Sequence, residues 1–140
     1  MGQNSHDEQG RKTGPWEEYF RDGRRSGHGD YLEGEKTGPW RYYLRDGALK
    51  AVGRYERGQL AGDWVWYRAN GGVLQAGAFA AGQQVGLWRR YHENGALLDS
   101  GHYVAGVRVG EWQFYAADGT LTRTKTFGKR TAGRKAVAED

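Results

Sequence analysis

Few side chains in this 140-residue sequence could act in catalysis or hold a metal ion. The chain contains no cysteine, which excludes disulfides, thiolate catalysis and cysteine-ligated zinc. His28, His92 and His102 are the histidines of its central part. Metal binding by His92 with His102 has no short ligand spacing to support it. We therefore expect a protein that is not an enzyme, with no catalytic residues, no cofactor and no metal site.

Binding is the more promising chemistry, because the sequence is rich in arginine and tryptophan, the residues most enriched at binding hot spots. Lys and Arg number 21 against 17 Asp and Glu, which gives a net charge of +4 and a pI near 9.4. Such a charge favours acidic partners. Much of it lies near the C-terminus, where a solvated basic tail is favoured over an arm that binds nucleic acid.

The elements that position these side chains belong to a repeat of 24 residues, present five times without an insertion. Self-similarity at a fixed period indicates a repeat architecture. Position by position, the units share the following residues: Gly14, Gly38, Gly62, Gly86 and Gly110; Trp16, Trp40, Trp64, Trp88 and Trp112; Tyr19, Tyr43, Tyr67, Tyr91 and Tyr115; and, in the first four units, Gly29, Gly53, Gly77 and Gly101. We call each such set a column.

Each unit also contains an Asp-Gly or Asn-Gly step between two β-prone stretches, as at Asp22-Gly23. This step predicts a β-hairpin with a two-residue type I′ loop. A second turn falls near Gly34, where residues 33–36 are expected to form a four-residue loop. The predicted fold is all-β: an elongated single-layer antiparallel meander of about five tandem hairpin repeats. Its parts are a disordered leader (1–11), the repeats (12–128) and a basic tail (129–140), either a short helix or disordered.

The two predicted loops set the pairing register. Trp16 should lie opposite Gly29, and Gly29 should also face Trp40. An aromatic ring over a glycine pins the register, since a slip by one residue would move the ring to the other face.

The same register sorts side chains into two faces. The tryptophan face carries the tryptophan column, the aromatic column that begins with Tyr31, and four aliphatic residues; we expect it to be the inner, concave side. The opposite, tyrosine face carries the tyrosine column among charged and polar residues. The aliphatic residues are Leu49, Val73, Leu97 and Leu121, and the charged and polar residues include Arg21, Arg41, Arg45, Arg89, Glu93 and Gln113.

The pattern Gly-x-Trp-x-x-Tyr-x-x-Asp/Asn-Gly, then Gly-x-Tyr, resembles the MORN repeat, and in particular the bacterial variant found in YwqK-type antitoxins. The resemblance covers about residues 12–128. The fifth unit departs from it, with Lys125 at the position of Gly101 and Arg130 at that of a loop glycine, as suits a capping unit. The resemblance implies an interaction role: neutralisation of a toxin in bacteria, or scaffolding and contact with acidic phospholipid in eukaryotic relatives.

Choline-binding repeats also combine tryptophan, paired tyrosines and glycine, as in residues 40–43 here. Their unit is shorter, and their ligand cages need aromatic rings from successive hairpins. Choline or carbohydrate binding is therefore the less favoured interpretation.

Trp66 is the tryptophan that the repeat does not require, since its column otherwise holds Glu18, Tyr42, Arg90 and Phe114. The register places it on the tryptophan face near Arg68, Arg90 and His92. We predict that these four residues bind a protein partner, because arginine forms forked hydrogen bonds with carboxylates. Ordinary variation between repeats is the competing explanation.

The function predicted from the sequence is a non-enzymatic protein-binding module, an antitoxin or immunity-like protein that sequesters an acidic toxin. The alternative is peripheral binding to acidic lipid, or a scaffold. Residues 1–12 are polar, so the chain as given is expected in the cytoplasm, although removal of an export signal would leave the same sequence. The oligomeric state is left open.

Overall fold

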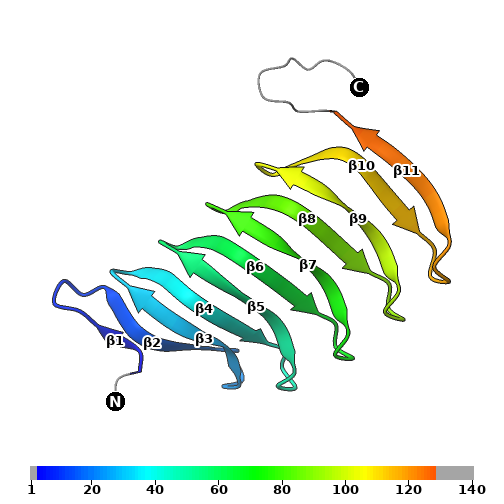
Figure 1. The fold of residues 1–140 in the computed structure, drawn as a ribbon. Coiled ribbons are helices and arrows are strands. Elements are labelled where there is room, and N and C mark those ends of the chain that lie inside the picture. The colour runs from blue at the N-terminus through cyan, green and yellow to red at the C-terminus, as the bar shows by residue number, and fades with distance from the viewer. Residues whose placement is uncertain (1–2, 129–140) are drawn as a thin grey trace.

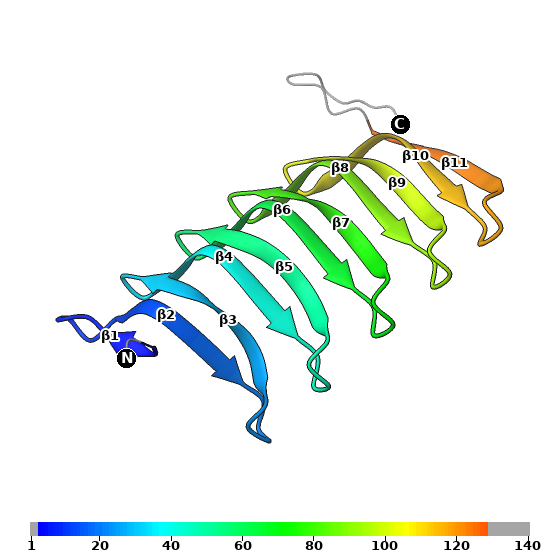
Figure 2. The ribbon, with the colours of Figure 1, turned by 60° about the horizontal axis from the view of Figure 1, so that its bottom comes forward.

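The computed structural model describes residues 3–128 as one sheet of eleven antiparallel strands, which follow one another in chain order. Figures 1 and 2 show a single layer with hairpin loops at both ends of the strands. The strands are β1 (Ser5–His6), β2 (Lys12–Tyr19), β3 (Arg25–Leu32), β4 (Glu35–Tyr43), β5 (Leu49–Glu56), β6 (Gln59–Tyr67), β7 (Val73–Ala80), β8 (Gln83–Tyr91), β9 (Leu97–Val104), β10 (Val107–Tyr115) and β11 (Leu121–Phe127). The predicted all-β meander is confirmed. No helix in residues 3–128 is long and apolar enough to span a membrane.

The Asp/Asn-Gly loops differ from the prediction. In the first, Phe20 N–H donates to Arg24 O and Gly23 N–H donates to Phe20 O. Gly23 has φ 94°, whereas Asp22 is not among the residues with positive φ. The loop is therefore a three-residue type I turn that ends in a left-handed glycine. The Asp22 carboxylate stabilises it by accepting a hydrogen bond from Arg24 N–H.

The type I′ turn lies at the other end of the strands. Leu32 pairs with Glu35, which leaves a two-residue loop of Glu33 and Gly34 with φ of 51° and 84°. The predicted four-residue loop is wrong, as was the two-residue loop at Asp22-Gly23. The loop at Asp22-Gly23 has three residues instead of the predicted two, and the loop at Glu33-Gly34 has two instead of the predicted four.

The predicted register nevertheless holds in the middle of the strands, because β-bulges compensate for the loops. Ser26 has no partner on β2, since Glu18 pairs with Gly27 and Tyr19 pairs with Arg25. This extra residue restores the predicted pairing of tryptophan with glycine in the first four units. The pairs are Trp16 with Gly29, Trp40 with Gly53, Trp64 with Gly77 and Trp88 with Gly101.

The equivalent bulges in the later hairpins overturn one face assignment. Directly opposed residues share a face, and the four aliphatic residues predicted on the tryptophan face pair with tyrosines. The pairs are Leu49 with Tyr43, Val73 with Tyr67, Leu97 with Tyr91 and Leu121 with Tyr115. These residues therefore lie on the tyrosine face, because the unpaired bulge residue shifts the alternation by one.

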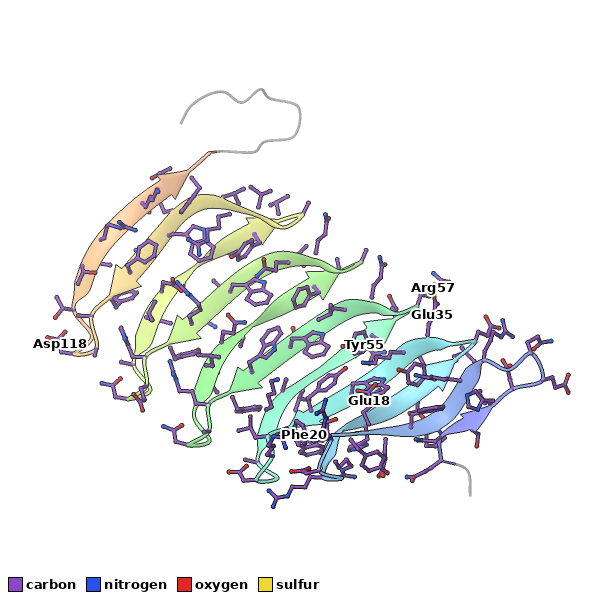
Figure 3. All side chains as sticks on the ribbon, turned by 180° about the vertical axis from the view of Figure 1, so that it is seen from behind. Glu18, Phe20, Glu35, Tyr55, Arg57 and Asp118 are labelled. Atoms are coloured by element: carbon purple, nitrogen blue, oxygen red, sulfur yellow. The ribbon has the colours of Figure 1, made fainter. Side chains whose placement is uncertain are left out.

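The core is a row of indole rings on the tryptophan face, shown in Figure 3 around Tyr55. Trp40, Trp64, Trp88 and Trp112 are 0%, 2%, 3% and 2% exposed. Each ring lies flat on the column glycine of the preceding unit and donates its Nε1–H to the carbonyl of the next residue, as Trp40 does to Asp30 O at 3.0 Å. A Cβ atom at Gly29 would lie 2.3 Å from Trp40 Cδ2, so only glycine fits there.

The N-terminal residues differ from the disordered leader that the sequence predicted. Ser5 and His6 form β1, which pairs with β2 through Thr13 and Lys12. The predicted basic tail, residues 129–140, lies outside the described residues.

Candidate binding site on the tryptophan face

Trp66 belongs to the packed aromatic row. Its ring stacks on Trp64 at 5.5 Å and 25°, lies 5.9 Å from Trp88, and meets Phe79 edge to face at 6.1 Å. Tyr42, one unit earlier in the same column, stacks between two tryptophans in the same way. Trp66 is therefore a half-buried framework ring as well as a surface group.

Arg68 and His92 lie beside the Asp/Asn-Gly loops, and each joins its unit to the next one. Arg68 Nη2 donates to Tyr91 O at 2.8 Å, and His92 Nε2 donates to Tyr115 O at 2.7 Å. The Nε of Arg68 is buried with no hydrogen-bond partner among the described residues. The structure thus assigns these two side chains to contacts between repeats. It does not gather the four predicted residues into one cluster.

Arg90 stands where the two preceding units have Trp66 and Tyr42. Instead of stacking as a ring would, it pairs with Asp99 on β9, whose side chain is fully buried. Arg90 Nε lies 3.1 Å from both carboxylate oxygens, and Nη2 also donates to Oδ2. These hydrogen bonds raise the pKa of the Arg90 guanidinium. A buried carboxylate is tolerated because it is paired in this way.

A cavity of about 140 Å³ opens beside this ion pair. Trp88, Trp112 and Tyr103 form its aromatic walls, and the remaining lining is polar: Gln75, Gln84, Arg90, Asp99 and Arg108. Three columns change character here. Gln75 and Asp99 replace the small Gly27 and Ala51, Gln84 replaces the lysines of the first two units, and Arg90 replaces a ring. The sequence interpretation identified Arg90 but missed the other polar residues, although a comparison of columns would have revealed them.

Arg108 supplies the available positive charge of this cavity. Its Cζ atom lies 4.4 Å from the Trp112 ring centroid, and its Nε donates to Tyr103 OH at 3.4 Å. The structure shows no ion pair of Arg108 with a carboxylate in residues 3–128. Since Asp99 balances Arg90, the cavity keeps one net positive charge and suits a carboxylate ligand.

A second basic site lies near the Asp/Asn-Gly loops of the first two units. Arg24, Arg25 and Arg45 surround Tyr43 in an open recess. Arg25 Cζ lies 4.8 Å from the Tyr43 ring, and Arg45 Cζ lies 4.8 Å from the ring of Phe20, whose position is marked in Figure 3. Arg25 and Arg45 also pair with Glu17 and Asp22, so their charge is partly neutralised.

The histidines make different contacts. His28 stacks on Tyr43 at 5.8 Å, with Nε2 3.0 Å from its hydroxyl oxygen. His102 is exposed, and its carbonyl accepts the Trp112 indole hydrogen bond. In residues 3–128 no group of three or more His, Cys, Asp or Glu side chains is placed to hold a metal ion.

Residues 84–105 match the family model described as MORN repeat variant. The matched segment runs from β8 through β9 and covers most of one copy of the 24-residue unit. The match supports a MORN-repeat protein, and therefore a binding module of the repeat type.

Comparison with solved structures finds similarity to two complexes of larger proteins. One is a mutant of S. aureus TarM with fondaparinux, alpha-GlcNAc-glycerol and UDP, at 13% identity and a TM-score of 0.42 over 64% of this chain and 18% of that chain. The other is the GtfA/B complex bound to UDP and GlcNAc, at 12% identity and a TM-score of 0.30 over 76% of this chain and 21% of that one. The chain thus spans about a fifth of the length of these two proteins. No curated protein sequence matches the chain.

Proposed function

We propose that this chain is a non-enzymatic protein-binding module that sequesters an acidic protein, in the manner of an antitoxin or immunity protein. The observation that carries the proposal is the cavity on the tryptophan face, where Arg108 has no carboxylate partner among the described residues. The proposal keeps Arg90 from the predicted site and replaces Trp66, Arg68 and His92 with residues that line the cavity.

The cavity fits one acidic side chain from a partner. Its volume of about 140 Å³ equals that of a few water molecules, each of which takes roughly 30 Å³ in the liquid. Arg108 is held in place by Trp112, so little side-chain freedom is lost when it binds a carboxylate. Truncation of one such central anchor weakens a complex by about 2 kcal/mol or more.

The test uses the product of the neighbouring gene as the candidate partner. It is co-purified with this chain and then titrated against Arg108→Gln, which removes the charge but keeps part of the stem over Trp112. The matched control is Lys36→Gln, in the same column three units earlier, where Lys36 lies 4.6 Å from the Trp40 ring.

We expect Arg108→Gln to weaken binding by about tenfold or more, as loss of a charge-assisted hydrogen bond does, and Lys36→Gln to leave it unchanged. Equal losses in both variants would show that general charge binds the partner, not the cavity. Absence of any complex would refute the proposed partner.

A second candidate function, binding to anionic lipid, is favoured by the open recess of Arg24, Arg25 and Arg45. Co-sedimentation with vesicles that contain or lack anionic lipid tests it, because an electrostatic attraction falls as salt rises. Salt-sensitive binding that is lost in Arg25→Gln with Arg45→Gln would support this function. Binding that persists in that variant, or no binding, would reject it.

A further inference from the structure

Residues 4–6 reproduce the end of a repeat strand. Ser5 pairs with Thr13, as Asp30 pairs with Thr37 one unit later. The Ser5 carbonyl therefore accepts the Trp16 Nε1–H bond at 3.2 Å, just as the Asp30 carbonyl accepts that of Trp40 at 3.0 Å. The first tryptophan thus has the carbonyl partner that a preceding unit would supply.

His6 takes the place of the aromatic residue that such a preceding unit would contribute. Its ring meets Trp16 edge to face at 5.5 Å and 90°. Tyr31 meets Trp40 at 5.5 Å and 88° in the equivalent position. A polar imidazole here completes the packing of Trp16 while it leaves a hydrophilic end on the stack.

Asn4 extends this cover along β2. Its backbone N–H donates to Pro15 O, and its side-chain amide bonds to both backbone groups of Glu17, as a paired strand would. We call residues 4–6 the half unit. It occupies the edge of β2 on which a further strand could otherwise pair.

The other end of the sheet is blocked by a different device. Lys125 pairs with Trp112 as Gly101 pairs with Trp88, so it stands in the column on which the next tryptophan would lie. A Cβ atom in this column would come within 1.9 to 2.3 Å of indole ring atoms at all four glycines, Gly29, Gly53, Gly77 and Gly101. Any side chain at position 125 therefore prevents a tryptophan-bearing strand from packing on β11.

The rest of β11 suits such a strand. Phe127 holds the position of Tyr31 and already meets Trp112 edge to face at 6.1 Å. Arg123 holds the position of Gly27, which pairs on its other side with Tyr42 of β4. Glu18 stands in the same column as Tyr42, one unit earlier. An approaching β2 from another molecule would place Glu18 opposite Arg123, so the charges are complementary.

We propose that the two ends of the sheet are complementary docking surfaces for a second copy of this chain, and that Lys125 and the half unit keep copies apart. The occupant of β11 would be β2 of the second copy. Removal of both blocks should let copies add head to tail, since a heterologous contact leaves the other end of each added copy open to the next.

Two full-length variants test the direction of this contact. The acceptor variant carries Lys125→Gly and retains its half unit. The donor variant carries Asn4→Ala with His6→Ala, which weaken the half unit, and retains Lys125. Circular dichroism first shows that each is folded. Sedimentation velocity then measures the mass of each alone and of their mixture.

We expect wild type and each variant alone to sediment as one copy. The mixture should form a 1:1 complex, and the fraction of chains in this complex should increase with concentration. A chain that carries all three substitutions should form head-to-tail oligomers of more than two copies. The matched control replaces Lys125→Gly with Lys125→Ala, which should abolish the complex because its single methyl group occupies the place of the ring. Equal association of the Gly and Ala acceptors, no complex in the mixture, or head-to-tail association of wild type would each overturn the proposal.

Discussion

The column glycines can be tested with the smallest possible side chain, at Gly77. A Cβ atom there would lie 2.0 Å from Trp88 Cδ2 and 2.1 Å from Cε2. Carbon atoms in contact stand about 3.5–4.0 Å apart, so Gly77→Ala must move the ring by roughly 1.5–2 Å or bend the strand. The floor beneath the ring is backbone, which cannot rotate away as a flexible side chain can.

The size of the effect follows from what Trp88 would lose. The ring is 3% exposed, donates to Ala78 O at 3.1 Å and packs against Trp66 and Phe79. Complete loss of a buried tryptophan costs about 3–5 kcal/mol, and overpacking alone about 1–3 kcal/mol. We expect Gly77→Ala to lower the free energy of unfolding by about 3 kcal/mol.

Gly86→Ala is the matched control. Gly86 has φ 73° and nothing within 4 Å of its added Cβ atom, so this variant bears only the strain of a left-handed alanine, about 1–2 kcal/mol. Urea unfolding followed by circular dichroism measures both variants, with the midpoint compared at constant slope. Tryptophan emission in Gly77→Ala should also shift to the red as Trp88 becomes exposed. A loss in Gly77→Ala no larger than that in Gly86→Ala would refute the packing argument.

Three further outcomes can be measured by the same unfolding assay. Trp66→Ala should lower the free energy of unfolding by about 2–3 kcal/mol, since three ring contacts are each worth about 0.5–1.5 kcal/mol. A loss below about 0.5 kcal/mol would show that Trp66 is a surface group and not part of the packed row. Asp99→Asn should cost about 2 kcal/mol, less than the 3–5 kcal/mol typical of a broken buried pair, because the Arg90 side chain is 45% exposed. Burial, and after it the positive charge of Arg25, lower the pKa of His28 from its usual 6.5. As the pH falls below 6.5, the unfolded chain therefore takes up a proton more readily than the folded one, and the stability falls. His28→Gln should lose part of this fall between pH 7 and 5, and an unchanged pH profile would contradict the argument.

The middle of each strand was predictable because tryptophan and glycine constrain one another there. A ring as large as Trp40 can lie flat on a strand only over a residue without a side chain. The recurrence of both residue types at fixed spacing therefore carries the register by itself. The predicted loops led to the same pairs only because β-bulges compensated for the errors in loop length.

The loops were not predictable from the Asp-Gly dipeptide alone. A type I′ turn and a type I turn with a left-handed glycine both favour that dipeptide. The choice depends on the Asp22 carboxylate, which accepts a hydrogen bond from Arg24 N–H. At the opposite edge, Glu33 takes positive φ although its residue type gives no such signal. The bulge residues, Ser26 in the first unit and Lys50 in the second, have no sequence signature either. The prediction therefore places Leu49 on the wrong face.

The candidate site was predictable in part. The correct register already placed Arg90 opposite Asp99, so the ion pair could have been found from the sequence. The roles of Arg68 and His92 could not, because their long side chains reach past the loop edge to the next unit. Alternation along a strand assigns a face, but it does not say how far a side chain extends.

The charged pair beside the cavity is hard to explain by stability alone. Replacing a buried ion pair by well-packed apolar residues is often neutral or stabilising by 1–4 kcal/mol. The molecule itself shows the apolar solution, since Tyr42 pairs with the buried Ala51 at the positions that Arg90 and Asp99 hold two units later. Function is therefore the better explanation for the pair.

The variant Arg90→Tyr with Asp99→Ala tests this argument, because it makes unit four resemble unit two at these positions. We expect its free energy of unfolding to equal or exceed that of wild type, since the new ring can stack between Trp88 and Trp112 as Tyr42 does between Trp40 and Trp64. The same ring would fill the cavity, so binding of the acidic partner should fall by about tenfold or more. A variant that loses stability would show that the ion pair is structural. A variant that keeps both its stability and its affinity would move the binding surface away from the tryptophan face.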